Sequence, residues 1–129
     1  MEHETIINHH PEGITLPPEE ELAEAARFLR TIGDPTKLRI VCVLAGIGDK
    51  GEGEREREIC AGSIAAALGM TNSAISHQLK ILRDEGLIRS RRVGKHVLYT
   101  LDDDHVYEAV AMTMEHIRHR HGTGSGKNA

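Results

Sequence analysis

Aromatic side chains are almost absent from this chain of 129 residues. It has one phenylalanine, two tyrosines and no tryptophan, so aliphatic side chains must build the core. An aliphatic core favours packed helices, and the missing aromatics exclude a stacking platform for single-stranded nucleic acid or RNA. The length indicates a single domain, and chains of this size often complete a modest core by dimerising.

Long apolar runs and a basic leader are also missing. No run approaches the roughly 20 apolar residues that span a bilayer, and the acidic start MEHE lacks the positive charge of a signal peptide. The only cysteines, Cys42 and Cys60, suggest no disulfide framework. We therefore expect a cytoplasmic protein that does not contact membranes.

The net charge of −4 argues against nucleic-acid binding, but its distribution does not. Residues 1–34 hold eight acidic and two basic side chains, whereas residues 71–100 hold six basic and two acidic ones. Binding responds to the local field more than to the total charge. The segment 71–100, with a local charge of +4, is thus a candidate DNA-binding surface.

The first half of the chain predicts two helices after a flexible arm at residues 1–18. Helical spacing of apolar residues and an acidic first turn predict the helix 19–31. Asp34 as N-cap and Pro35 at the first helical position begin the next helix, which ends near Ala45. We expect its core side to contain Leu38, Val41, Cys42 and Leu44. The Gly-rich, charged stretch 46–57 predicts a solvated loop without an assigned role.

Residues 63–101 predict a helix-turn-helix followed by a wing. A short helix 63–68 ends at Gly69, and Thr71 caps a second helix that runs to about Glu85. The inner side of the second helix is Ile75, Leu79 and Leu82. Alternating segments 87–93 and 96–101 around Gly94 and Lys95 predict a β-hairpin. A hairpin directly after a recognition helix is typical of a wing.

A long helix from Asp102 to about His121 precedes a disordered tail at residues 122–129. Its apolar stripe is Val106, Val110, Met114 and Ile117, which we expect a second copy to cover. The predicted fold is therefore mainly α with a small β-hairpin. Residues 19–121 form a winged helix-turn-helix domain that is homodimeric through its N- and C-terminal helices.

Polar side chains on the second helix and bases on the hairpin form the predicted contact surface for double-stranded operator DNA. Short polar groups near a helix N-terminus reach base edges, whereas Lys and Arg meet phosphate. The alternative is a solvated helix beside a basic hairpin. The candidate DNA-binding residues are Asn72, Ser73, Ser76, His77, Lys80, Arg83, Arg91, Arg92 and Lys95.

Metal-ligating residue types gather on the last helix. His105 and His116 are eleven residues apart, so at 100° per residue they differ by only about 20° around the helix. His119 lies about 40° to the other side, and Asp103 precedes His105 by two residues. Eleven residues rise roughly 16 Å, however, whereas metal–nitrogen bonds measure about 2 Å. One helix therefore cannot bring His105 and His116 to the same ion.

Two antiparallel copies of the helix remove this obstacle, because facing positions then have a constant index sum. His105 with His116 sums to 221 and Asp103 with His119 sums to 222, so both pairs align together. One oxygen and three imidazole nitrogens suit tetrahedral Zn²⁺. Adding His121 and His3 would give six ligands, which suit Ni²⁺ or Co²⁺ better. The alternative is that these are exposed histidines that bind no metal. Whether His3, His9, His10 or His121 joins the metal ligands stays open.

Four segments resemble the ArsR/SmtB family of metal-sensing repressors over about residues 19–121. These are GDPTKLRI at 33–40, EIC at 58–60, SAISHQLKILR at 73–83 and LDDDHV at 101–106. The resemblance implies a homodimer with one winged helix per subunit. It also implies binding to an operator near metal-handling genes and release by metal, which would control metal efflux or homeostasis.

The family resemblance also separates two kinds of metal site. The family's thiolate site follows a Cys-x-Cys or Cys-x-x-Asp pattern, but Gly62 and Ser63 stand where partners of Cys60 would be. A soft-metal or arsenic sensor is therefore not expected. Asp-x-His followed by His-x-x-His resembles the zinc and cobalt sensors, and the added His121 and His3 resemble the nickel–cobalt sensors. Residues 46–57 are longer than the family norm.

Two other functions stay open at this point. The first is a winged-helix regulator that answers thiol oxidation, for which Cys60 is the candidate although it lacks a resolving partner. The second is a metalloenzyme, which needs an open metal position and a nearby base. Four protein ligands close the shell, so we expect no enzyme and no catalytic residue.

Overall fold

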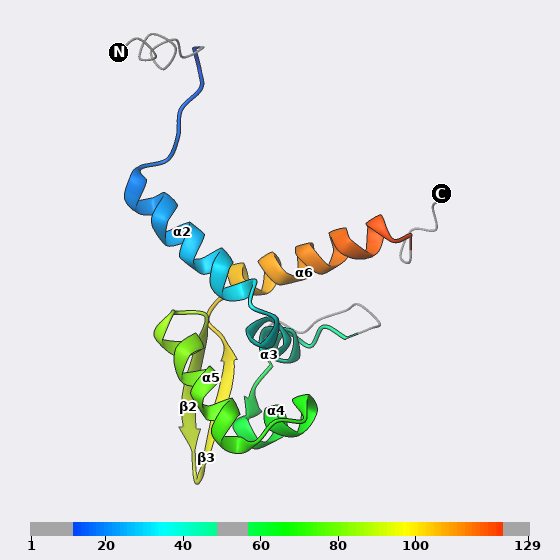
Figure 1. Cartoon of the computed structure of the whole chain (residues 1–129). Helices are drawn as coiled ribbons and strands as arrows, with labels where there is room; N and C mark the ends of the chain where they lie inside the picture. The colour runs from blue at the N-terminus through cyan, green and yellow to red at the C-terminus, as the bar shows by residue number, and fades with distance from the viewer. Residues whose placement is uncertain (1–11, 49–56, 123–129) are drawn as a thin grey trace.

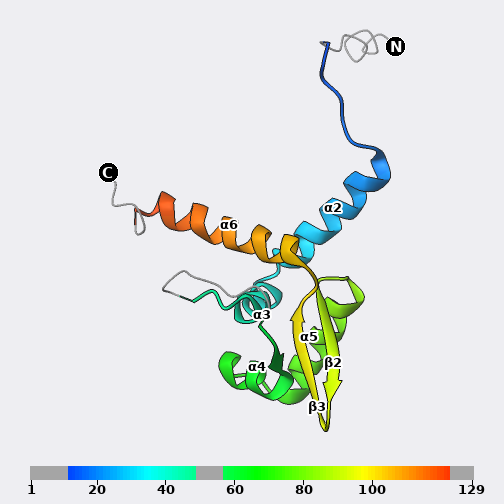
Figure 2. The ribbon, with the colours of Figure 1, turned by 180° about the vertical axis from the view of Figure 1, so that it is seen from behind.

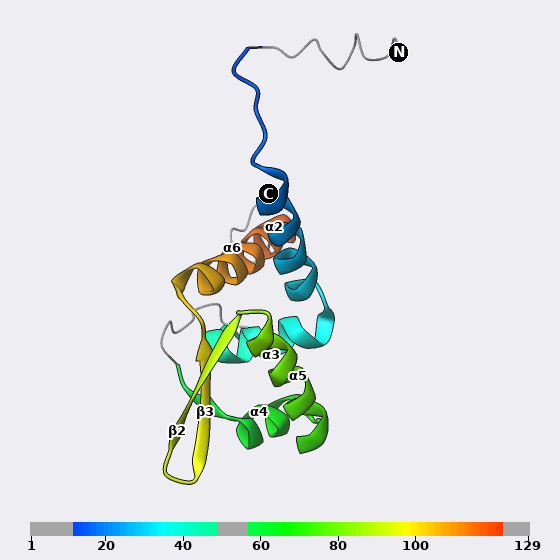
Figure 3. The ribbon, with the colours of Figure 1, turned by 90° about the vertical axis from the view of Figure 1, so that its left-hand side faces the viewer.

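The computed structural model describes residues 12–48 and 57–122. Figure 1 shows the order of helices and strands, and Figure 3 shows the same chain from the side. The expected positions of His3, His9 and His10, most of the 46–57 loop and most of the tail lie outside the described residues. The elements are α2 (Glu19–Ile32), α3 (Pro35–Ala45), β1 (Ile59–Cys60), α4 (Ala61–Leu68), α5 (Asn72–Asp84), β2 (Ile88–Val93), β3 (His96–Leu101) and α6 (Asp104–Arg120).

The caps predicted for the helices are confirmed. The Asp34 carboxylate accepts a hydrogen bond from the Lys37 amide at 3.0 Å, and Pro35 opens α3. Thr71 caps α5 by accepting from the Ala74 amide at 3.1 Å. Gly69 ends α4 with φ of 67°, a left-handed conformation that suits a residue without Cβ. These local signals set the turn between α4 and α5.

The sheet has three strands in the order β1-β3-β2, all antiparallel. The hairpin pairs Val93 with His96 at its tip and Ile88 with Leu101 at its base, as predicted. Sequence reasoning missed β1, which pairs with the middle of β3. Two residues are too short to show alternation, so only the fold reveals this strand. Helix α4 begins at Ala61, two residues before the predicted start at Ser63. Strand β1 ends at Cys60, which is also the N-cap position of α4, so the helix follows the strand without a loop.

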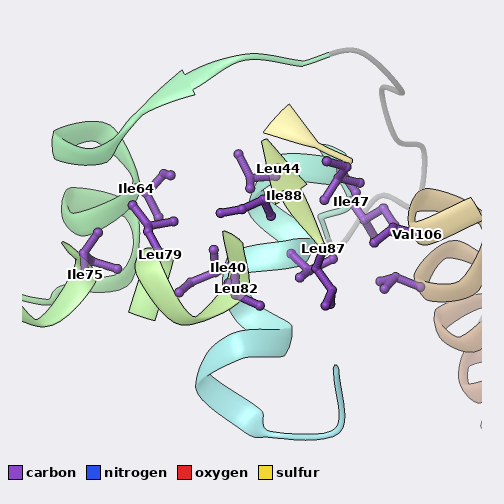
Figure 4. Close-up of a cluster of buried hydrophobic side chains, with 14 of the residues drawn as sticks. Ile40, Leu44, Ile47, Ile64, Ile75, Leu79, Leu82, Leu87, Ile88 and Val106 are labelled. Atoms are coloured by element: carbon purple, nitrogen blue, oxygen red, sulfur yellow. The ribbon is translucent and has the colours of Figure 1, made fainter. Parts of the chain in front are cut away.

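The core lies between α3, α4, α5, the hairpin and the first half of α6, as Figure 4 shows. Val41, Leu44 and the three inward residues of α5 are buried as predicted, whereas Leu38 and Cys42 are only half-buried. Ile40 was not predicted but is fully buried. Each fully buried aliphatic side chain stabilises the fold by about 1.5–3 kcal/mol, so this cluster holds the helix-turn-helix and the wing together.

The apolar stripe predicted for α6 needs a correction. Val106 and Val110 are buried in the chain's own core at 4% and 0% exposure, so they are not available to a second copy. The residue that sequence reasoning overlooked is Met112, which is 67% exposed on the other side of the helix. Met114 is half-buried and Ile117 is 40% exposed. The helix therefore has a core side and a separate exposed side.

Helix α2 contains no buried residue in the single chain, although its apolar spacing is regular. Leu29 is 64% exposed, and Leu22 is 37% exposed. Figures 1 and 2 show α2 and α6 extending away from the body on one side of the molecule. No helix in the described ranges 12–48 and 57–122 is long and apolar enough to cross a membrane.

Candidate nucleic-acid interface and candidate metal residues

Helix α5 separates its residues into a core side and an outer side. Ile75, Leu79 and Leu82 are buried. The polar residues of its outer side are all exposed: Asn72, Ser73, Ser76, His77 and Lys80. The N-terminal part of α5 and the hairpin tip lie at the same end of the molecule, away from α6 (Figures 1 and 3). This arrangement allows the helix and the wing to meet one DNA duplex.

Two basic residues at the end of α5 have partners within the chain. The Lys80 ammonium donates to the Asp84 carboxylate at 3.0 Å, an exposed ion pair one helical turn apart. Exposed pairs of this kind contribute little to stability, so Lys80 can exchange Asp84 for a phosphate. Arg83 donates to the Ser90 hydroxyl at 3.4 Å and so joins α5 to β2.

The basic residues of the wing do not form one cluster. Lys95 lies in the turn, and Arg92 pairs with Val97 next to it. Arg91 is one pair further from the tip, and strand alternation directs it to the opposite face of the sheet. There its guanidinium donates twice to the Glu58 carboxylate, at 2.6 and 2.8 Å. Arg91, one of the predicted DNA-binding residues, thus joins the wing to the segment before β1.

The Glu58–Arg91 pair also changes the electrostatics of the wing. The hydrogen bond from Arg91 holds the pKa of the Glu58 carboxyl below its ordinary value, so the carboxylate stays charged at neutral pH. The positive charge of Arg91 is therefore opposed by a fixed negative charge. Arg92 and Lys95 remain as the wing cations best placed for phosphate.

We expect these cations to affect DNA binding differently. Replacing Arg92 or Lys95 by alanine should reduce the slope of log affinity against log salt by about 0.9, the value for one lost phosphate contact. Replacing Glu58 by glutamine together with Arg91 by alanine removes a neutral pair, so the slope should stay unchanged. Salt titrations of operator binding measure both. A drop of about 0.9 in the double variant would show that Arg91 contacts phosphate.

The four candidate metal ligands lie at opposite ends of α6. Asp103 and His105 are at its start, and His116 and His119 are in its last turns. All four are exposed. No group of three metal-ligating side chains comes together within the described part of the chain. The single chain thus brings Asp103 to His105 but leaves the other two about 16 Å or more along the helix.

Helix α6 starts later than predicted, and this places Asp103 at its N-cap position rather than within the helix. The helix begins at Asp104, two residues after the predicted start, and Asp103 is its N-cap. One carboxylate oxygen accepts from the Val106 amide at 3.1 Å, and the other is 3.5 Å from Nδ1 of His105. The Val106 N–H holds the pKa of this carboxyl below its ordinary value. Asp103 is therefore a charged candidate ligand that is held beside His105.

The exposed side of α6 carries the histidines on one stripe with Met112. Met112 is seven residues after His105 and four before His116, so all three share one helix face within about 20–40°. This stripe lies opposite Val110, which is buried. The exposed side of the helix thus has an apolar centre with histidine side chains at both ends. Such a pattern suits pairing with an antiparallel copy of the same helix.

The two cysteines have different environments. Cys60 is half-exposed, and its sulfur is 3.4 Å from the Ser63 hydroxyl, an interaction that lowers the pKa of the thiol. Burial raises the pKa of the Cys42 thiol instead. A lower pKa increases the fraction of reactive thiolate, which makes Cys60 the better candidate for oxidation.

Comparison with known proteins gives consistent matches. Residues 34–90 match the family described as bacterial regulatory protein, arsR family. A "Transcriptional repressor SmtB homolog" of Synechocystis is 34% identical over 89% of this chain and 77% of that protein. A "Cadmium resistance transcriptional regulatory protein CadC homolog" of Staphylococcus aureus is 30% identical over 74% of this chain and 71% of that one. The crystal structure of an antimony-specific repressor, AntR, superimposes with a TM-score of 0.68 at 25% identity, covering 88% of this chain and 96% of that one.

Proposed function

Because the chain belongs to the ArsR family of bacterial transcriptional regulators, we propose that it is a metal-responsive repressor. In this proposal a cytoplasmic homodimer binds operator DNA without metal and leaves it when Zn²⁺, or alternatively Ni²⁺ or Co²⁺, binds between the subunits. The observation that carries the proposal is the exposed stripe of α6. It places Asp103 and His105 at one end and His116 and His119 at the other.

The unpaired faces of the terminal helices support the dimer. Met112 and Leu29 expose most of their apolar surface in the single chain. An antiparallel α6 pair would cover Met112 and align Asp103 and His105 with the partner subunit's His116 and His119. Two identical sites related by twofold symmetry follow, as expected for a homodimer with an isologous interface.

The donor set favours a borderline metal. One carboxylate and three imidazoles suit tetrahedral Zn²⁺, and further nitrogen or oxygen ligands would suit Ni²⁺ or Co²⁺. His121 follows α6 directly and is exposed, whereas His3 lies outside the described residues. When bound, the metal would act as a cross-link between subunits rather than as a reaction centre. We propose no catalytic activity, because four protein ligands leave no open position.

The names of two related proteins mention metal or metalloid elements, namely cadmium and antimony. They support an inorganic effector for this chain as well. The thiols of this chain are only Cys42 and Cys60, and Cys42 is half-buried. Soft ions prefer several thiolates, so the proposed effector is a borderline metal at α6.

The deciding experiment is operator binding by the metal-free protein, titrated separately with Zn²⁺, Ni²⁺ and Co²⁺. We expect metal to weaken binding by a factor in the usual allosteric range, about 5–150. The most effective metal identifies the preferred effector. Unchanged affinity with all three metals would contradict the proposal.

A second candidate function is regulation by oxidation of Cys60, which is favoured by the lowered pKa of its thiol. We expect Cys60→Ser to leave metal-driven release within about twofold of the wild type, because Cys60 is not among the α6 ligands. Operator binding of both proteins, with zinc and separately with peroxide, measures this. Loss of the peroxide response in Cys60→Ser, together with no zinc response in either protein, would favour the redox function instead.

A further inference from the structure

Arg89 joins the wing to the residue that precedes the candidate metal ligands. Its Nε donates to the backbone carbonyl of Asp102 at 3.0 Å and lies 3.9 Å from the Asp102 carboxylate. The amide of Asp102 in turn donates to the carbonyl of Leu87 at 2.9 Å. Asp102 is therefore held from both sides by the β2 strand and the residue before it. Figure 2 shows that α6 begins where the base of this hairpin ends.

Covalent geometry connects this contact to Asp103. The carbonyl of Asp102 and the amide of Asp103 belong to one planar peptide unit, which cannot twist internally without a large energetic cost. A rotation of the peptide unit that joins Asp102 to Asp103 therefore turns the oxygen that Arg89 binds. Asp103 also caps α6 through the Val106 amide. A ligand that shifts the backbone of Asp103 as it binds the carboxylate would consequently act on the Arg89 contact.

The other face of β2 contacts the recognition helix. Ser90 accepts a hydrogen bond from Arg83 of α5 at 3.4 Å. Strand alternation places Arg89 and Ser90 on opposite faces, so β2 is bonded to the start of α6 on one face and to α5 on the other. A movement of β2 therefore changes the placement of both DNA-contacting elements, the wing and α5.

We propose that Arg89 is a positioning residue that couples metal binding at Asp103 and His105 to the wing and α5 of the same subunit. This inference rests on the proposed function and adds a route by which the metal-bearing helix affects the DNA-binding surface. Arg89 does not bind metal in this proposal, and it does not contact bases. Its side chain is 62% exposed, so replacing it should not disturb the core.

The test compares operator affinity with and without Zn²⁺ in the wild type, Arg89→Gln, Arg89→Lys and the control Arg92→Gln. Arg92 is on the same strand, its replacement by glutamine removes the same charge, and its side chain makes no hydrogen bond within residues 12–48 and 57–122. We expect Arg89→Gln to reduce the ratio of the two affinities roughly tenfold, within the range for residues that modulate coupling. Arg89→Lys retains a donor for the Asp102 carbonyl, so its ratio of operator affinities without and with Zn²⁺ should be close to that of the wild type. Arg92→Gln should weaken both affinities equally.

A measurement without metal provides an independent readout. We expect hydrogen exchange at the Asp102 amide to be several-fold faster in metal-free Arg89→Gln than in the wild type, because its surroundings lose a restraint. The same amide in Arg92→Gln should exchange at the wild-type rate.

The outcomes separate this inference from the proposed function. A wild type that does not respond to Zn²⁺ would overturn both. A responsive wild type with an unchanged ratio in Arg89→Gln would overturn the role of Arg89 and leave the metal-released repressor intact. An equal loss of the ratio in Arg92→Gln would show a general effect of charge, which also contradicts the proposal.

Discussion

Replacing His116 by alanine is expected to abolish the release of operator DNA by zinc, while the metal-free variant binds operator as tightly as the wild type. The reason is that His116 is exposed on α6, and α6 lies at the opposite end of the molecule from the hairpin tip (Figure 1). In the proposed dimer it supplies one of four ligands. Even an outer-shell partner of a metal site is worth about 10–100-fold in affinity, so removal of a direct ligand should weaken zinc binding at least that much.

Thermodynamic linkage sharpens this prediction. If zinc weakens operator binding by a given factor, operator must weaken zinc binding by the same factor. Zinc affinity of the wild type should therefore differ between free and operator-bound protein by about 5–150-fold. Equal affinities in the two states would exclude allosteric release by this site, however tightly zinc binds.

The matched control for this experiment is Glu115→Ala. Glu115 is exposed on the same helix next to His116, but it lies about 100° away around the helix. We expect it to retain zinc binding and release. A similar loss in both variants would indicate damage to α6 rather than removal of a ligand.

Replacing Met112 by aspartate is expected to convert the dimer into monomers and to reduce operator affinity by at least 10³-fold. Met112 lies at the centre of the stripe that would face the antiparallel helix, and a carboxylate there would be buried without a partner. A monomer reaches only one half-site, so its binding approaches the non-specific level, which is typically 10³-fold or more weaker. Sedimentation at micromolar concentration and operator titration measure the two effects.

Two further variants test whether this loss is specific to the interface. Leu29→Asp should have a similar effect, because Leu29 is 64% exposed on α2. Leu16→Asp is the control, since Leu16 is 80% exposed in the segment before α2. A Met112→Asp protein that remains dimeric would contradict the antiparallel α6 pairing. The zinc sites would then have to be formed in another way.

The correction at α6 shows where helical periodicity alone was insufficient. Helical spacing identified the apolar stripe from Val106 to Ile117. It did not show whether the chain's own core or a second copy would cover that stripe. The structure shows that the chain's own core covers Val106 and Val110 and leaves Met112 outside. A periodic pattern specifies a face of a helix, whereas the packing of α3 and β3 decides which neighbour meets that face.

The sequence by itself determined the elements whose signals are local. Asp34, Pro35, Gly69 and Thr71 set helix ends through hydrogen bonds and backbone preferences within a few residues, and the Gly94 turn set the hairpin register. It also placed the candidate metal residues on one helix, because their helical angles follow from spacing.

Only the tertiary structure decided which charges meet. Glu58 and Arg91 are 33 residues apart, and Arg89 and Asp102 are 13 apart, so no local pattern indicates either contact. They meet because β1 and β2 flank β3 and because the hairpin leads directly into α6. These contacts pair Arg91, a predicted DNA-binding residue, with a carboxylate and give Arg89 its link to Asp102. Contacts between residues far apart in the sequence depend on the order of the strands. Burial of the shared core fixes that order, and the charged residues that form these contacts do not.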